Sequence, residues 1–256
     1  MSNIQIIIFI LMIPLSLCIG SFLNVVIYRL PEMMQNEESH LNLAFPTSHC
    51  PHCKHKLNWK HNIPVLSYIF LKGRCAFCKK SIAWHYPAVE LISLTLSLIL
   101  VIFAPLALLA PSLIFTWILI SLFFIDLKHQ LLPDNLTLSL LWLGLLVNCF
   151  YFFTPIQDAV IGAVAGYLVL WIIAFLFKYF RHKDGLGGGD MKLLAALGAW
   201  LGWQQLPLVV LISSILCLVC LSVLIAIKKH RADQTFPFGP FLIFAGWIVY
   251  LKVLML

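Results

Sequence analysis

Eight long apolar stretches divide this sequence and leave little room for any fold other than a membrane bundle. Their predicted ranges are 4–28, 87–104, 106–125, 136–154, 157–177, 190–206, 207–227 and 238–256. An α-helix needs about 20 apolar residues to cross a bilayer. The chain is 62% hydrophobic and 11% charged, whereas a soluble domain is about half apolar and a quarter charged. The sequence therefore predicts an all-α polytopic integral membrane protein with about eight transmembrane helices.

Basic residues predict how these helices are oriented. Lysine and arginine gather in the loop 29–86 and after the third, fifth and seventh stretches, whereas the loops near 105–111, 153–158 and 203–206 contain none. Basic loops stay on the cytosolic side, so both termini are predicted to face outward, away from the cytosol. The net charge of +7 therefore indicates a membrane surface, and no nucleic-acid partner is expected. The first stretch lacks the pattern of a cleavable signal peptide.

The loop 29–86 carries a metal-binding pattern. Two CxxC pairs, Cys50 with Cys53 and Cys75 with Cys78, are separated by a spacing that suits a tetrahedral Zn²⁺ site. Free thiols or a redox pair are the alternative. Four cysteines close the coordination shell, so we expect one structural zinc per chain. The predicted domains are a first helix (1–28), a cytosolic zinc-binding loop domain (29–86) and a transmembrane helical domain (87–256).

Two aspartates lie at helix ends on the same predicted side of the membrane. Asp126 ends the third stretch, and Asp190 follows a glycine-rich segment and begins the sixth. We expect them to meet and share one proton, because two close carboxylates cannot both ionise cheaply. Such a pair can activate water and protonate a leaving amine. Gly187 and Gly189 would let a substrate backbone lie close to Asp190.

Each acidic residue also has a purely structural interpretation. Asp190 stands at a helix start, where an aspartate is commonly an N-cap. Asp126 is harder to explain in this way, because the helix dipole disfavours negative charge at a C-terminal end. Asp134 follows a proline, which favours a turn or N-cap role. The sequence assigns no role to Glu90.

Several motifs together resemble one family. They are Gly20-Ser21-Phe22-Leu23-Asn24 with Arg29-Leu30-Pro31, the two CxxC pairs, Tyr86-Pro87-Ala88-Val89-Glu90, the segment from Asp126 to Asp134, and Gly187-Gly188-Gly189-Asp190. In this order they resemble the bacterial type IV prepilin peptidases, membrane aspartic proteases of the GxGD type. The resemblance covers essentially the whole chain.

The resemblance implies two activities at the inner (cytoplasmic) membrane. It implies cleavage of the leader peptide of type IV prepilins and type II secretion pseudopilins on the cytosolic side. It also implies N-methylation of the new N-terminal residue with S-adenosylmethionine. The family's catalytic aspartates match Asp126 and Asp190, and its zinc ligands match the four cysteines. No glycine fingerprint for a methyl donor is visible, so the residues that bind S-adenosylmethionine are unknown.

Two other functions fit parts of the sequence. Intramembrane carboxylates and glycine-broken helices also occur in ion-coupled transporters, although no internal repeat is visible here. An intramembrane protease with an unrelated substrate would use the same aspartates. The specific pilins, the oligomeric state, the substrate entry route and the roles of Asn24 and Arg29 stay open at this stage.

Overall fold

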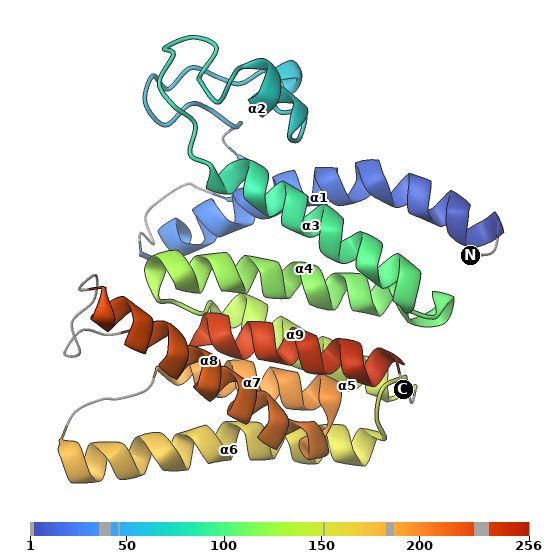
Figure 1. The fold of residues 1–256 in the computed structure, drawn as a ribbon, viewed down its shortest axis with the longest axis vertical. Coiled ribbons are helices and arrows are strands. Elements are labelled where there is room, and N and C mark those ends of the chain that lie inside the picture. The colour runs from blue at the N-terminus through green and yellow to red at the C-terminus, as the bar shows by residue number, and fades with distance from the viewer. Residues whose placement is uncertain are drawn as a thin grey trace. The chain divides into compact units, whose positions relative to one another are not determined.

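The computed structural model describes residues 3–35, 42–45, 47–150, 152–182, 187–227 and 236–255, and these residues form an all-helical fold. Its long helices, drawn in Figure 1, are α1 (Asn3–Gln35), α3 (His85–Phe103), α4 (Leu106–His129), α5 (Asp134–Asn148), α6 (Ile156–Arg181), α7 (Gly188–Leu201), α8 (Leu206–Ala226) and α9 (Gly239–Met255). The short ones are η1 (Trp59–His61), α2 (Leu66–Phe70) and η2 (Trp203–Gln205). Within the described ranges, extended pairing is limited to two isolated bridges in the loop before α3.

Each of the eight predicted stretches corresponds to one long helix. Five helical segments are long and apolar enough to cross a membrane, namely α1, α3, α4, α6 and Trp203–Ala226, which joins η2 to α8. The chain is therefore a multi-pass membrane protein. The helix α9 is a shorter apolar helix, and α5 and α7 have only 15 and 14 residues. Of these three helices, α7 is almost entirely buried by its neighbours, so its length does not have to match the thickness of the bilayer.

The chain divides into two compact units, Met1–Ser121 and Leu122–Leu256, with the boundary inside α4. In the first unit α3 packs along α1. Gly20 permits this approach, since a Cβ at this position would lie 2.7 Å from the Cα of Glu90. Hydrogen bonds link the same two helices: Ser93 donates to the carbonyl of Ser16 at 3.0 Å. Small and hydroxyl side chains are typical of close helix contacts in membranes.

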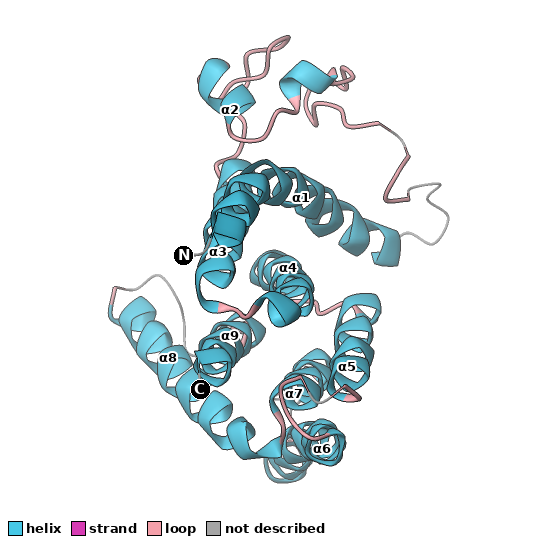
Figure 2. Cartoon of the chain, turned by 90° about the vertical axis from the view of Figure 1, so that its right-hand side faces the viewer, coloured by secondary structure: helices cyan, strands magenta, loops and turns pink. Residues whose placement is uncertain are grey.

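The second unit is built around α7. Figure 2 looks along the helices and shows α5, α6 and α9 around α7, and each of the three packs against it. The contact with α6 is a backbone approach, since a Cβ on Gly162 would collide with the carbonyl oxygen of Gly198. A Cβ on Gly166 would likewise lie 2.6 Å from the carbonyl oxygen of Leu194. Glycines that face each other in this way place α7 against α6 with little freedom.

Buried polar groups fix the far end of α7. Asn148, at the end of α5, donates to the carbonyl of Ala199 at 2.8 Å and accepts from the backbone N–H of Phe153 at 3.1 Å. Trp200 Nε1 donates to the carbonyl of Leu140 at 2.8 Å. These bonds satisfy buried groups, which are costly to leave unpaired. They set the position of α7 and therefore of the residues at its beginning.

Candidate active site and metal centre

Asp126 lies in the last turn of α4, with its carboxylate almost fully buried. The helix ends shortly after it, where Gln130 adopts φ 52° and donates its N–H to the carbonyl of Asp126 at 2.9 Å. The side chain is 5% exposed. Within the described part of the chain, its Oδ2 atom is buried and has no hydrogen-bond partner. A buried oxygen without a partner is costly, and a water molecule or a substrate group would satisfy it.

Asp190 lies in the first turn of α7. Gly187 precedes the helix in an extended conformation, and its carbonyl accepts the N–H of Asp190 at 3.2 Å. The side chain is 8% exposed. Asp190 is therefore inside the helix and is not its N-cap, in contrast to the structural alternative considered from the sequence. A carboxylate in the first turn is favoured by the helix dipole.

The two aspartates belong to one cluster. They are close enough for the charge of Asp126 to act on Asp190. Their neighbours also meet, since a Cβ on Gly189 would lie 2.8 Å from Leu132 Cβ, and a Cβ on Gly239 would lie 3.3 Å from Leu132 Cδ1 and collide with Asp126 Oδ2. The ends of α4 and the starts of α7 and α9 therefore converge on one buried carboxylate pair.

The predicted glycines have different surroundings. Gly189 is tightly packed, because an added Cβ would lie 2.8 Å from Leu132 Cβ. Gly187 is less confined, with Asp190 Oδ2 at 3.7 Å from the position of an added Cβ. Gly188 has open space around it. Gly185, the first glycine of the segment, lies outside the described residues. The segment thus combines one packed glycine with open space next to the carboxylate of Asp190.

Gly239 is a site residue that the sequence analysis missed. It begins α9, and only glycine fits there, since any side chain would occupy the space of the Asp126 carboxylate. The dipeptide Gly239-Pro240 at the start of the last apolar stretch was the available signal. A glycine–proline pair marks a break between elements, but it does not indicate which distant carboxylate lies against it.

An ion pair borders the cluster. Asp134, in the first turn of α5, accepts from Lys192 Nζ at 2.6 and 2.8 Å. Both side chains are partly exposed, so solvent screens this pair and its contribution is small. Asp134 is thus a first-turn residue that pairs with a basic residue of α7.

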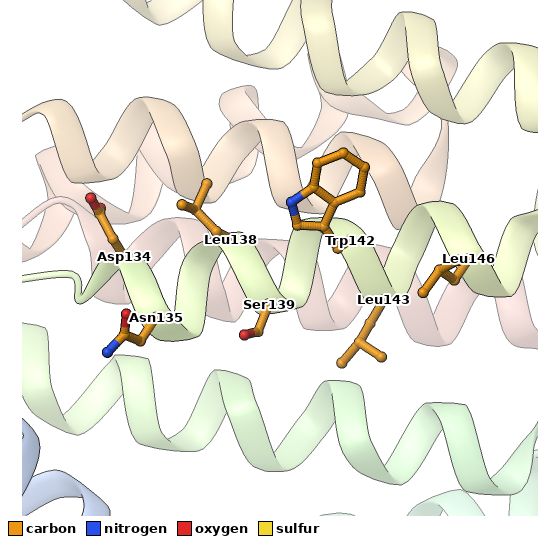
Figure 3. Close-up of a pocket in the computed structure, with 7 residues that line it drawn as sticks. All are labelled: Asp134, Asn135, Leu138, Ser139, Trp142, Leu143 and Leu146. Carbon is orange, nitrogen blue, oxygen red and sulfur yellow. The ribbon is translucent and has the colours of Figure 1, made fainter.

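A groove of about 470 Å³ runs along one face of α5, starting at Asp134. Figure 3 shows Leu138, Trp142 and Leu146 along it. Its lining is largely apolar and belongs to one helix, so an apolar helical segment would complement it.

The four cysteines of the loop form one cluster. Their Sγ atoms all lie within 4.8 Å of one another, and Cys50 Sγ is 3.9 Å from Cys78 Sγ. Four sulfurs about 2.3 Å from a tetrahedral zinc ion would lie about 3.8 Å apart. The donor set and its spacing therefore fit a closed metal site made of four thiolates.

The two cysteine pairs sit in equivalent turns. The N–H of Lys54 donates to the carbonyl of Cys50, and the N–H of Lys79 donates to the carbonyl of Cys75, and both lysines have φ 58°. Backbone N–H groups of Cys78 and Phe77 stabilise the thiolate of Cys75 and lower its pKa to about 7. Thiolates are the form that binds zinc, so the backbone geometry already favours metal binding.

Three polar residues without a sequence-assigned role connect the loop to the helices. The backbone N–H of Val65 donates to Glu90 Oε2 at 2.7 Å. Asn24 Nδ2 donates to the carbonyl of Tyr86 at 3.0 Å. In addition, Arg29 donates to the carbonyl of Asn42 at 2.8 Å. Glu90 and Arg29 connect α3 and α1 to residues of the loop, and Asn24 connects α1 to the start of α3. These side chains therefore position the loop on the two helices.

Comparison with known proteins identifies the family of the chain. Residues 15–104 match the family model described as the Bacterial Peptidase A24 N-terminal domain, and residues 113–222 match the Type IV leader peptidase family. A protein of Aeromonas salmonicida (strain A449) named prepilin leader peptidase/N-methyltransferase is 47% identical over 92% of this chain and 88% of its own length. The protein of the same name from Pseudomonas aeruginosa is 43% identical over 93% of this chain and 88% of its own length. No solved structure matches. With relatives this similar over nearly its full length, the chain belongs to the type IV leader peptidase family.

Proposed function

We propose that this protein is a membrane aspartic endopeptidase and N-methyltransferase. It removes the leader peptide of type IV prepilins and type II secretion pseudopilins and methylates the new N-terminal residue. The observation that carries the proposal is the buried pair Asp126 and Asp190 in a chain of the leader peptidase family. Relatives named prepilin leader peptidase/N-methyltransferase support both activities.

Hydrolysis needs one ionised and one protonated carboxyl group. The ionised member accepts a proton from water as the water oxygen attacks the scissile carbonyl carbon, and the protonated member donates to the carbonyl oxygen. The tetrahedral intermediate then collapses, the C–N bond breaks, and the amine leaves with a proton from the pair. No covalent enzyme intermediate forms. The buried Oδ2 of Asp126, which has no hydrogen-bond partner among the described residues, supports this role, because it can accept a hydrogen bond from water.

The glycines at the start of α7 give access to this pair. Open space around Gly188 and the distance of 3.7 Å between an added Cβ on Gly187 and Asp190 Oδ2 support a role in admitting a substrate backbone. Gly189 has a second role, since its contact with Leu132 holds the start of α7 in place. The groove on α5 supports binding of the hydrophobic helix of a pilin next to the site.

Methyl transfer joins the same substrate to a second reaction. S-adenosylmethionine, when bound, would supply the methyl group that the N-terminal amine produced by cleavage accepts. The name of the relatives supports this activity. No residue of this chain is assigned to the methyl donor, and the loop 29–86 with the end of α1 is the proposed neighbourhood.

The four cysteines hold one structural Zn²⁺ in this proposal. Cys50, Cys53, Cys75 and Cys78 supply four thiolates and leave no open coordination position for substrate. The metal would supply folding energy to the loop and no step of hydrolysis. With the zinc assigned to the loop, we propose three domains: a first helix (1–28), a zinc-binding loop (29–86) and a peptidase region (87–256).

The protein is proposed to reside in the bacterial inner membrane. Both termini face the periplasm, and the loop and the carboxylate pair face the cytosol. The distribution of lysine and arginine between loops supports this orientation. Substrates therefore reach the site from the cytosolic side of the bilayer.

Mass spectrometry of a prepilin incubated with the purified protein and S-adenosylmethionine tests both activities. The expected product lacks the leader and carries one methyl group on its new N-terminus. Leader loss without methylation would remove the transferase and retain the protease. An unchanged prepilin, with folded protein, would refute the proposal and favour a transporter or a protease for another substrate.

A further inference from the structure

The short helix α2 presents an unusual apolar surface within a basic loop. Leu66, Ile69 and Phe70 are spaced so that they share one face of a helix, and they are 51%, 62% and 81% exposed. Phe70 is the most exposed large apolar side chain in the described part of the chain. Tyr68, on the opposite side of α2, packs against Gly73 of the loop. Among the described residues of its own unit, none covers the exposed face of α2.

The position of α2 is fixed by a buried residue of α3. Val65, which precedes α2, adopts φ 58°, a conformation that a β-branched residue rarely takes. Its N–H donates to the buried carboxylate of Glu90 at 2.7 Å. This bond compensates for the local strain and connects α2 to the membrane helix pair of α1 and α3.

Glu90 also sets the depth of α2. It lies five residues after His85, where α3 begins, which corresponds to roughly 8 Å along the helix axis. Figure 1 shows α2 alongside the pair of α1 and α3 and not beyond their ends, and Figure 2, which looks along the helices, shows α2 to one side of this pair. Since α3 is a candidate membrane span, its first turns lie close to one boundary of the bilayer and bring α2 near the interfacial region.

The charge of the surrounding loop suits an anionic surface. Residues 42–86 contain no aspartate or glutamate. They contain seven basic residues, Lys54, Lys56, Lys60, Lys72, Arg74, Lys79 and Lys80. Two of these, Lys72 and Arg74, follow α2 directly. Trp84, at the other edge of the loop, is 73% exposed and immediately precedes α3, a position where tryptophan is enriched at membrane interfaces.

We propose that α2 is an interfacial membrane anchor that inserts Leu66, Ile69 and Phe70 at the boundary between headgroups and acyl chains of an anionic leaflet. The basic residues bind the lipid headgroups, and Glu90 holds the anchor at the correct depth through Val65. Apolar burial combined with basic charge is the usual basis of interfacial binding. The proposal concerns the lipid and stands independently of the peptidase activity.

Fluorine NMR of the full-length protein in lipid nanodiscs tests this directly. A trifluoromethyl phenylalanine at position 70 reports its surroundings, in phosphatidylcholine and phosphatidylglycerol mixed at about three to one. A doxyl-labelled lipid is expected to broaden the signal strongly, and a water-soluble gadolinium chelate only weakly. The same reporter at position 175 of the membrane helix α6 provides the lipid-exposed standard.

Variants sharpen the measurement. Leu66→Ser with Ile69→Ser should shift the reporter at position 70 from lipid to water, whereas Leu43→Ser, which removes an exposed apolar residue of the loop outside α2, should not. Broadening by lipid should fall at least about threefold in phosphatidylcholine alone, because the anionic attraction is lost. A zinc assay on each variant verifies that the loop is folded.

Two results would overturn the proposal. The first is broadening by the gadolinium chelate and not by the lipid. The second is protection of position 70 that arises only when a prepilin is added, which would make the face of α2 a docking surface for the substrate.

Discussion

The helix α7 and the four-cysteine loop are held together in opposite ways. From Asp190 to Leu201 every residue of α7 except Lys192 is buried. Between residues 47 and 84 the only buried side chains among those described are Cys50 and Cys75. The helix is therefore positioned by packing against α5, α6 and α9. The described residues of the loop form no hydrophobic core, and they are held by the four-cysteine cluster and a few hydrogen bonds. The carboxylate pair belongs to the packed region.

Loss of zinc should have the largest effect on stability, and it should act first on the loop. Cys50→Ser with Cys53→Ser should abolish zinc binding and unfold the loop, because structural zinc contributes on the order of 10 kcal/mol to such sites. We expect methylation to fall at least as much as cleavage. Zinc content and limited proteolysis measure the outcome. Cys217→Ser with Cys220→Ser, at the same spacing in α8, is the control, and unchanged zinc in the loop variant would refute the ligand assignment.

Replacement of either aspartate should impair cleavage at the carboxylate pair and leave the four-cysteine loop intact. Asp126→Asn or Asp190→Asn should lower the cleavage rate by about 10²- to 10⁴-fold, because asparagine cannot transfer the proton. Zinc content and folding should be unchanged. Asp158→Asn is the matched control, since that carboxylate accepts from Trp203 and Gln204 away from the pair. Normal cleavage by either site variant would contradict the catalytic assignment.

Alanine substitutions at three glycines test how closely the residues around the carboxylate pair are packed. Gly239→Ala and Gly189→Ala should each cost about 1–3 kcal/mol through overpacking, and Gly239→Ala should also displace Asp126 and slow cleavage. Gly188→Ala is the control, because an added Cβ meets nothing within 4 Å. Thermal unfolding and cleavage rates in the same detergent would measure the difference. Equal behaviour of all three variants would show that the site is not packed as described.

The hydrogen bond between Glu90 and Val65 should contribute less to stability than the zinc site does. Glu90→Ala leaves the N–H of Val65 without its acceptor and should cost about 1–3 kcal/mol. Glu90→Gln keeps an acceptor oxygen and should restore much of this stability. Hydrogen exchange at residues 65–70 is the appropriate measurement, since global unfolding would not isolate α2. Identical exchange in the two variants would argue against the hydrogen bond.

The smallest effect is expected for the ion pair. Lys192→Met should change stability by only about 0.2–1 kcal/mol, because both partners are partly exposed. High salt should reduce even this difference. A loss of cleavage comparable to that of the aspartate variants would instead mean that Lys192 acts in catalysis.

The sequence predicted the features that depend on local pattern. The length of the apolar stretches predicted the eight long helices, and the CxxC spacing predicted the cysteine cluster. Each of these features depends on a short segment of the sequence. The proximity of Asp126 and Asp190 followed from their common predicted side of the membrane. Their catalytic role stays a prediction.

Other features depend on contacts between distant segments, which no local pattern encodes. Gly239 lies more than 100 residues after the carboxylate that it contacts, and the positive φ of Val65 depends on Glu90 across 25 residues. The division of the chain within α4 was also not predicted, because a continuous apolar helix carries no signal for it. The shortness of α7 likewise reflects its protein surroundings.

The most direct test of the carboxylate pair is a comparison of prepilin cleavage by Asp126→Asn, Asp190→Asn and the double variant. Residues that act as a unit show losses that do not add. We therefore predict that the double variant is no slower than the slower single variant. Independent losses that multiply in the double variant would contradict the claim that the two aspartates form one catalytic pair.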